Sequence, residues 1–265
     1  AYRVGVLEAL GAIHEGKFEK VVLARSCTLV RERPFDVSQV LAALRAAHPQ
    51  CFVYAVGRGD ASFVGATPEG LLRRDGVHVH ADALAGTAPR GRTPDEDAQY
   101  ALALRESKKE QAEHASVVRQ LRAALSADGA TVHTPEAPTI LALDALQHLH
   151  TRVAARLPER QTPTALTLAG RVHPTPAVAG APSDAARAWL REHEQLARGW
   201  YAGGIGWLAP GGDGSLAVAL RCALLRGGEA RLYAGAGVVD GSTPDAELEE
   251  TRLKLRAALA ALVEL

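Results

Sequence analysis

Tight glycine turns between short apolar runs constrain the fold of this chain more than any other feature. Residues 70–82 alternate in hydrophobicity around Asp75-Gly76, and residues 204–239 contain two further pairs of runs, each turning on a Gly-Gly pair. Asp-Gly and Gly-Gly favour the two-residue turns of β-hairpins, because these residues tolerate a positive φ. Since a hairpin joins neighbouring antiparallel strands, the sequence predicts antiparallel sheets.

Segments with helical periodicity lie between the predicted hairpins, and the longest covers residues 94–126. Residues 132–157 give mixed signals and end in a predicted strand, whereas residues 162–182 begin as a helix and break at prolines. The other predicted helices are residues 4–17, 36–48, 183–199 and a closing helix from Pro244, and the other predicted strands are residues 18–30, 51–58 and 61–66. The predicted fold class is therefore α+β, with mainly antiparallel sheets flanked by helices.

Composition bounds the kind of protein. A chain of 265 residues can bury a large core, as one domain or as two packed lobes. The 30 basic and 30 acidic residues cancel, so no overall field favours nucleic acid or an anionic membrane. The three cysteines have neither disulfide nor zinc spacing, which fits a reducing cytoplasm.

The ends and the surface of the chain give further expectations. The sequence opens on Ala1 and contains no methionine, so we expect N-terminal sequence to be missing. No apolar run approaches the roughly 20 residues that span a bilayer. No long exposed apolar stripe stands out, and we expect a soluble monomer.

An acidic cluster marks the start of the closing helix. Glu247 and Glu250 are three residues apart, so their side chains project from one helical face about one turn apart. Two such carboxylates are suitable ligands for a hard cation such as Mg²⁺. The simpler interpretation is a solvated first turn, where the helix dipole favours acidic residues.

Three further features have both a functional and a simpler interpretation. Lys20 lies within an apolar strand, where it is either a buried base or an edge lysine that reaches water. Glu69 follows a strand end, as either a placed acid or a solvated turn residue. Gly235 and Gly237 weaken a strand unless a group must approach its backbone closely.

Nine runs, in this order, carry a family resemblance. They are KVVLAR (20–25), GATPEGLLR (65–73), LAGTAPRG (84–91), SKKEQAEH (107–114), LQHLHT (146–151), HPTPAVAG (173–180), GWYAGGIGW (199–207), VALRCALL (218–225) and YAGAGVVDGSTPDAELEETRLKL (233–255). With them, the chain resembles the chorismate-utilising enzymes, most closely the isochorismate synthases. The resemblance implies stacked antiparallel sheets, as in anthranilate synthase component I, and one chorismate-binding catalytic domain over residues 1–265.

The resemblance implies a magnesium cofactor and gives the acidic cluster a role. Carboxylates that match Glu113, Glu247 and Glu250 hold the ion in this family, and the ion holds a carboxylate of chorismate. Mg²⁺ prefers a few carboxylates together with waters and substrate oxygens. Lys254 would further relieve the repulsion among the acids.

The same resemblance assigns an isomerase reaction and its acid and base. Water adds at C2 of chorismate and the C4 hydroxyl leaves, which requires a base and an acid. Lys20 matches the base and Glu69 the acid, so the reaction needs a neutral amine and a protonated carboxyl. We expect burial to favour both neutral forms. The other matched residues are assigned to substrate binding: Thr87, in a loop lining the pocket, and His148, Tyr201, Arg221, Gly235, Gly237 and Lys254.

Local differences separate the members of this family. Lys20 stands where anthranilate synthases carry glutamine, and the stretch ALAGT lacks the lysine of the PIKGT motif in aminodeoxychorismate synthases. HPTPAVAG is typical of isochorismate synthases, whereas salicylate synthases read nearer PAVTASG. Salicylate synthase and a non-catalytic module that binds magnesium and a carboxylate stay open as alternatives. The sequence does not distinguish menaquinone from catechol-siderophore biosynthesis.

Overall fold

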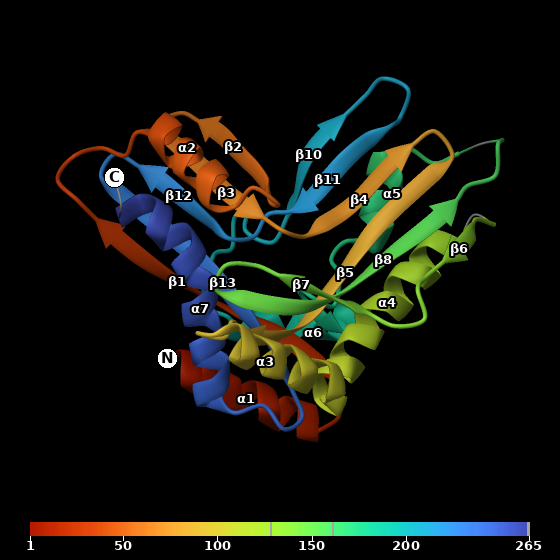
Figure 1. Ribbon diagram of the computed structural model, residues 1–265, viewed down its shortest axis with the longest axis horizontal. Helices are drawn as coiled ribbons and strands as arrows, with labels where there is room; N and C mark the ends of the chain where they lie inside the picture. Colours follow the sequence, from red (N-terminus) through yellow and green to blue (C-terminus); the bar gives the residue numbers. More distant parts are fainter. Residues whose placement is uncertain (128, 161, 264–265) are drawn as a thin grey trace. The chain divides into compact units, whose positions relative to one another are not determined.

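Two compact units make up the chain in the computed structural model (Figure 1). The structure describes residues 1–127, 129–160 and 162–263. The first unit comprises Ala1–Pro68, Val178–Gly203 and Ala219–Leu265, and the second comprises Glu69–Ala177 and Gly204–Val218. Each unit is therefore assembled from segments far apart in the sequence. The prediction of one catalytic domain over residues 1–265 stays a prediction.

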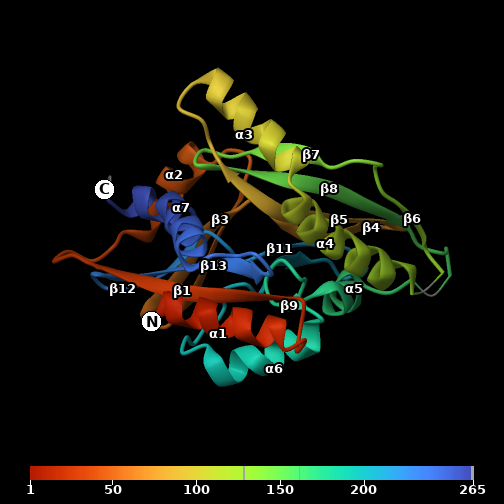
Figure 2. The same ribbon diagram turned by 90° about the horizontal axis from the view of Figure 1, so that it is seen from below.

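The first unit is built on a six-stranded antiparallel sheet with the order β2-β3-β12-β13-β1-β9. Its strands are β1 (Lys20–Val30), β2 (Phe52–Arg58), β3 (Ala61–Thr67), β9 (Gly180–Ala181), β12 (Cys222–Arg226) and β13 (Glu229–Val239). Its helices are α1 (Tyr2–His14), α2 (Val37–Ala47), α6 (Ser183–His193) and α7 (Pro244–Val263). Figure 2 shows α1 and α6 beside β1 and β9.

The two faces of this sheet differ. Val21 of β1 lies opposite Val238 of β13, and both are buried in a cluster with α1 and α6. Leu232 of β13 is buried on the same face against α2 and α7. Because side chains alternate along a strand, Lys20 and its partner Val239 belong to the opposite face. The helices therefore cover one face, and Lys20 lies on the other.

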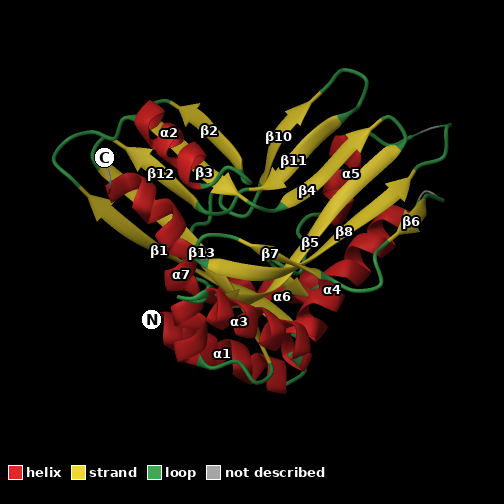
Figure 3. Cartoon of the chain, viewed as in Figure 1, coloured by secondary structure: helices red, strands yellow, loops and turns green. Residues whose placement is uncertain are grey.

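The second unit is built on a seven-stranded sheet with the order β10-β11-β4-β5-β8-β6, to which β7 adds by pairing with β8 (Figure 3). Its strands are β4 (Gly70–Asp75), β5 (His78–Pro89), β6 (Thr131–His133), β7 (Thr139–Ala142), β8 (Leu146–Arg156), β10 (Gly204–Leu208) and β11 (Gly214–Val218). Its helices are α3 (Pro94–Glu106), α4 (Lys108–Ser126) and α5 (Ala165–Val172). The α4 helix packs on β5 and β8.

The structure confirms the α+β class and all three predicted hairpins, but corrects two helices. The predicted helix over residues 94–126 is two helices, because Ser107 is extended (φ −67°, ψ 112°) and caps α4 by accepting from the Glu110 N–H. The predicted helix over residues 183–199 ends at His193, because Glu194 is extended (φ −82°, ψ 110°). Among the described residues, every helix is too short or too polar to cross a bilayer.

His114 fastens α4 to the second sheet. Its Nδ1 donates to the carbonyl of Ala85 on β5 at 3.2 Å, and its Nε2 lies 2.7 Å from Thr151 Oγ1 on β8. Since a carbonyl only accepts, Nδ1 carries the proton, and Nε2 of the neutral ring accepts from the threonine hydroxyl. Burial lowers the pKa of His114.

The pH dependence of stability should therefore include a His114 contribution. Because the folded-state pKa is lowered, the stabilisation is present above the unfolded pKa, about 6.5, and is lost as pH falls through the folded value. We expect His114→Gln to cost about 1–3 kcal/mol at pH 7.5 and to lose less stability than the wild type between pH 7.5 and pH 5. Thermal unfolding of both proteins at pH 7.5 and pH 5 measures the loss of stability and its pH dependence. An unchanged pH dependence of stability in His114→Gln would contradict this assignment.

Candidate active site

The acidic cluster at the start of α7 is partly buried. Glu247 is 2% exposed and lies on the helical face that continues through the buried Thr251 and Leu255. Thr243 caps this helix, because its Oγ1 accepts from the Ala246 N–H at 3.3 Å. The solvated-turn interpretation is therefore wrong for Glu247, because a carboxylate on the packed face is withdrawn from water.

Lys254 and Tyr2 interact with these two carboxylates. Lys254 Nζ lies 2.6 Å from Glu250 Oε1 and donates to the Gly235 carbonyl at 2.9 Å, so it ties α7 to β13. Burial, followed by the charges of Glu247 and Glu250, raises the pKa of Tyr2. Tyr2 was missed from the sequence, because nothing local connects the first turn of α1 with the start of α7.

Lys20 opens β1 and is 3% exposed. It pairs with Val239 of β13 on one side and with Ala181 of β9 on the other. The HPTPAVAG motif (173–180) leads into β9, whose first residue Gly180 pairs with Val21 and whose second, Ala181, pairs with Lys20. The interpretation of Lys20 as an edge lysine that reaches water is wrong, because β9 occupies that edge.

The approach of Tyr201 explains the glycine at position 235 of β13. The ring of Tyr201 stacks on Tyr233 with centroids 5.5 Å apart. A Cβ atom added at Gly235 would lie 3.0 Å from Tyr201 Oη and 3.2 Å from Val22 Cγ1. The group that approaches this strand is thus the tyrosine hydroxyl. Gly237 lies opposite Val22 in the same ladder.

Arg221 has an unusual backbone conformation. Its φ is 49°, in the left-handed region that non-glycine residues rarely adopt. Tyr54 Oη donates to the Leu220 carbonyl at 3.2 Å, and the Ala66 N–H donates to the Arg221 carbonyl at 3.2 Å. Such conformations persist where neighbours over-determine them, often at binding sites. Tyr54 was missed, because only pairing of β2 with β3 brings it to this segment.

Thr87 and His148 meet in the second unit. They are paired residues of β5 and β8, and Thr87 Oγ1 lies 3.1 Å from His148 Nδ1. The predicted loop at Thr87 is wrong: the residue lies within β5, just after a β-bulge where Gly86 has a φ of 80°. The Thr87 N–H donates to Glu110 Oε2 at 3.0 Å, and Glu110 is a further neighbour that the sequence analysis missed.

Glu69 and Glu113 also belong to the second unit. Glu69 is 4% exposed, and its carbonyl accepts from the Val218 N–H at 3.0 Å. This burial contradicts the interpretation of Glu69 as a solvated turn residue. Glu113 is half-buried on α4.

The predicted acid–base pair and the predicted metal ligands divide between the two units. Lys20, Glu247 and Glu250 belong to the first unit, whereas Glu69 and Glu113 belong to the second. Across the described ranges, no group of three or more His, Cys, Asp and Glu side chains is arranged to hold a metal ion. The approach of Lys20 to Glu69 and the gathering of the three carboxylates therefore stay predictions.

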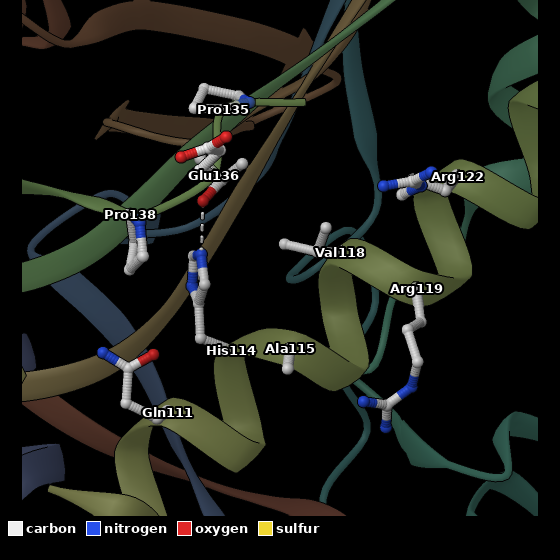
Figure 4. A pocket seen from close by; sticks show the side chains of 10 residues that line it. Gln111, His114, Ala115, Val118, Arg119, Arg122, Pro135, Glu136 and Pro138 are labelled. Atoms are coloured by element: carbon white, nitrogen blue, oxygen red, sulfur yellow. Dashed lines mark hydrogen bonds between the residues drawn. The ribbon is translucent and has the colours of Figure 1, made fainter. Parts of the chain in front are cut away.

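A cavity of about 380 Å³ opens on the second unit beside α4. Figure 4 shows Gln111 and His114 on α4, and Arg119 further along it, with Glu136 across the cavity. His114 also lines the cavity, but both of its ring nitrogens already form hydrogen bonds. The predicted site residues are not among those that line it.

These features define an α+β protein with buried ionisable side chains on its sheets and at its strand ends. Residues 1–263 match the family model described as chorismate binding enzyme. The chain belongs to this family, which confirms the resemblance drawn from its nine runs.

Named relatives and a solved structure agree with this membership. The salicylate biosynthesis isochorismate synthase of Pseudomonas aeruginosa is 42% identical over 97% of this chain and 53% of its own length. The isochorismate synthase MenF of Bacillus subtilis is 37% identical over 96% and 54%, respectively. The menaquinone-specific isochorismate synthase MenF of Escherichia coli has a TM-score of 0.90 at 33% identity, covering 98% of this chain and 60% of that one. The chain thus spans about half the length of the curated relatives it matches.

The close packing at Gly235 leads to a stability prediction. Gly235→Ala places a methyl group against Tyr201 and Val22, so we expect a loss of about 1–3 kcal/mol in the free energy of unfolding, measured in urea. Gly57→Ala is the matched control, since Gly57 is also a strand glycine and an added Cβ meets nothing within 4 Å. Equal stability of the two variants would contradict the close approach of Tyr201.

Proposed function

We propose that this protein is a magnesium-dependent isochorismate synthase that converts chorismate to isochorismate. The observation that supports it most directly is the burial of two ionisable residues at strand ends, Lys20 at 3% and Glu69 at 4% exposure. Burying such groups is costly unless they have a specific role or specific partners. The names of the relatives add support for this reaction over others in the family.

The proposed reaction uses Lys20 as base and Glu69 as acid. The Lys20 amine takes a proton from water as the water oxygen bonds to C2 of chorismate. Both ring double bonds shift, from C1=C2 and C5=C6 to C6=C1 and C4=C5, the C4–oxygen bond breaks, and the Glu69 carboxyl donates a proton to the departing hydroxyl. Lys20 ends protonated and Glu69 ionised, and a proton returned from one to the other through solvent completes the cycle.

Arg221 and Tyr201 are proposed to hold a carboxylate of the substrate. A guanidinium offers two parallel N–H donors, which match a carboxylate better than a lysine ammonium does. Burial raises the pKa of Tyr201, while the charges of Arg198 and, more weakly, Arg221 lower it, so Arg221 and Tyr201 share one electrostatic environment. Tyr201 therefore remains a hydroxyl donor. Thr87 and His148 are also proposed to contact the substrate.

Magnesium fits the donor set of α7. Glu247 and Glu250 offer carboxylate oxygens, the ligand type Mg²⁺ prefers, and one of them is buried where an added positive charge is favourable. Together with Glu113 they would hold the ion, which supplies positive charge to a substrate carboxylate when bound. Lys254 already neutralises part of this acidic cluster. We further propose that the protein acts as a cytoplasmic monomer in menaquinone or catechol-siderophore biosynthesis.

Product analysis tests the proposed function. The protein is incubated with chorismate and Mg²⁺, without ammonia or a partner enzyme, and the products are separated by chromatography. We expect a mixture of chorismate and isochorismate. Salicylate with pyruvate would instead identify a salicylate synthase, and Mg²⁺-dependent chorismate binding without turnover would identify a binding module.

The role of Lys20 has its own test. We expect Lys20→Ala to lower kcat by at least about a hundredfold, since general base catalysis contributes 10²–10⁴-fold, while Mg²⁺-dependent binding of chorismate in calorimetry persists. Lys17→Ala, at a 59% exposed lysine just before β1, should retain full turnover. Full residual turnover of Lys20→Ala would overturn its assignment as the base.

A further inference from the structure

The edge of β1 beyond Lys20 is closed by side chains. β9 pairs only with Lys20 and Val21, so the strand next to β1 ends there. Further along this edge, the Val22 carbonyl accepts from Arg198 Nη2 at 2.7 Å, and the Ala24 N–H donates to Glu194 Oε2 at 2.8 Å. An ion pair thus continues the ladder that a strand would otherwise supply.

This ion pair is held in a fixed geometry. Arg198 Nε donates to Glu194 Oε1 at 2.6 Å and Nη2 donates to Oε2 at 2.7 Å, so the contact is bidentate. The Arg198 side chain is 21% exposed and the Glu194 side chain is 5% exposed. A bidentate, largely desolvated pair is more strongly oriented than an exposed one.

The same arginine connects two other parts of the site. Its Nη1 donates to the Val178 carbonyl at 2.9 Å, in the segment that leads into β9. The neighbouring Ala179 carbonyl accepts from the Val22 N–H at 2.9 Å. The Arg198 carbonyl accepts from the Tyr201 N–H at 3.0 Å. One residue therefore contacts β1, the β9 segment and the backbone of Tyr201.

We propose that Glu194 and Arg198 are a positioning pair that fixes the Lys20 end of β1 against the β9 segment. This inference rests on the proposed function, in which Lys20 is the base. Neither side chain touches the reacting atoms; both act through the backbone two and four residues beyond Lys20. Since an unsupported strand edge opens more readily, loss of the pair lets Lys20 move, and catalysis is sensitive to displacements of about 1 Å.

The test compares two isosteric variants. Glu194→Gln keeps an acceptor for Ala24 and removes the bidentate ion pair. Asp213→Asn is the matched control in the second unit, because Asp213 also accepts from one arginine, Arg74 at 2.7 Å, and from one backbone N–H, that of Gly76 at 2.9 Å. We expect Glu194→Gln to lower kcat at least about tenfold with the KM for chorismate within about threefold, while Asp213→Asn keeps kcat within about twofold.

A second variant and a second measurement complete the test. Arg198→Lys keeps the charge but cannot bond both carboxylate oxygens and two carbonyls at once, so it should also lower kcat more than KM changes. Amide hydrogen exchange of residues 19–25 should accelerate in both Glu194→Gln and Arg198→Lys and stay unchanged in Asp213→Asn. Unchanged exchange, or equal loss of kcat in the two isosteric variants at equal Tm, would overturn the proposal. If the wild type makes no isochorismate, the proposed function fails, and exchange alone still decides whether the pair holds this strand.

Discussion

The antiparallel pairing of β1 with β13 is the interaction on which the first unit depends. It runs without a register shift from Lys20 opposite Val239 to Val30 opposite Glu229. A slip of one residue would turn Lys20 toward the helices and Val21 away from the core. The same register fixes Gly235 beside Tyr201, and α7 follows β13 after a short turn that Ser242 stabilises by accepting from the Val239 N–H. One ladder therefore positions the proposed base, the glycine contact and the acidic cluster.

Burial of ionisable side chains is a second feature of the molecule. Lys20, Glu69 and Glu247 are each almost completely buried, which a folding chain does not tolerate without specific surroundings. The Glu194–Arg198 pair belongs to the same pattern, since each partner also bonds the backbone of β1. In the second unit, His114 is instead kept neutral, and burial lowers its pKa. The protein thus uses ionised pairs where backbone must be held and a neutral ring where a helix meets a sheet.

Backbone irregularities lie close to the predicted substrate contacts. Arg221 has a positive φ, and the bulge at Gly86 brings Thr87 opposite His148. Each departs from a regular strand, and each is fixed by contacts from other elements: Tyr54 of β2 in one case and Glu110 of α4 in the other. Such departures are expected where a site requires a geometry that a regular ladder does not provide.

The sequence by itself determined the hairpins, the α+β class, the family and the residues to examine, because turn chemistry, periodicity and motif order are local properties of the chain. It also located the start of α7 and the strand of Lys20. It misjudged the helix over residues 94–126, since a single extended residue, Ser107, interrupts an otherwise continuous pattern. Tertiary structure alone decided that Glu247 is buried and that Tyr2 approaches the acids. It alone revealed that Glu194 and Arg198 complete the edge of β1, because such contacts join residues up to 176 positions apart.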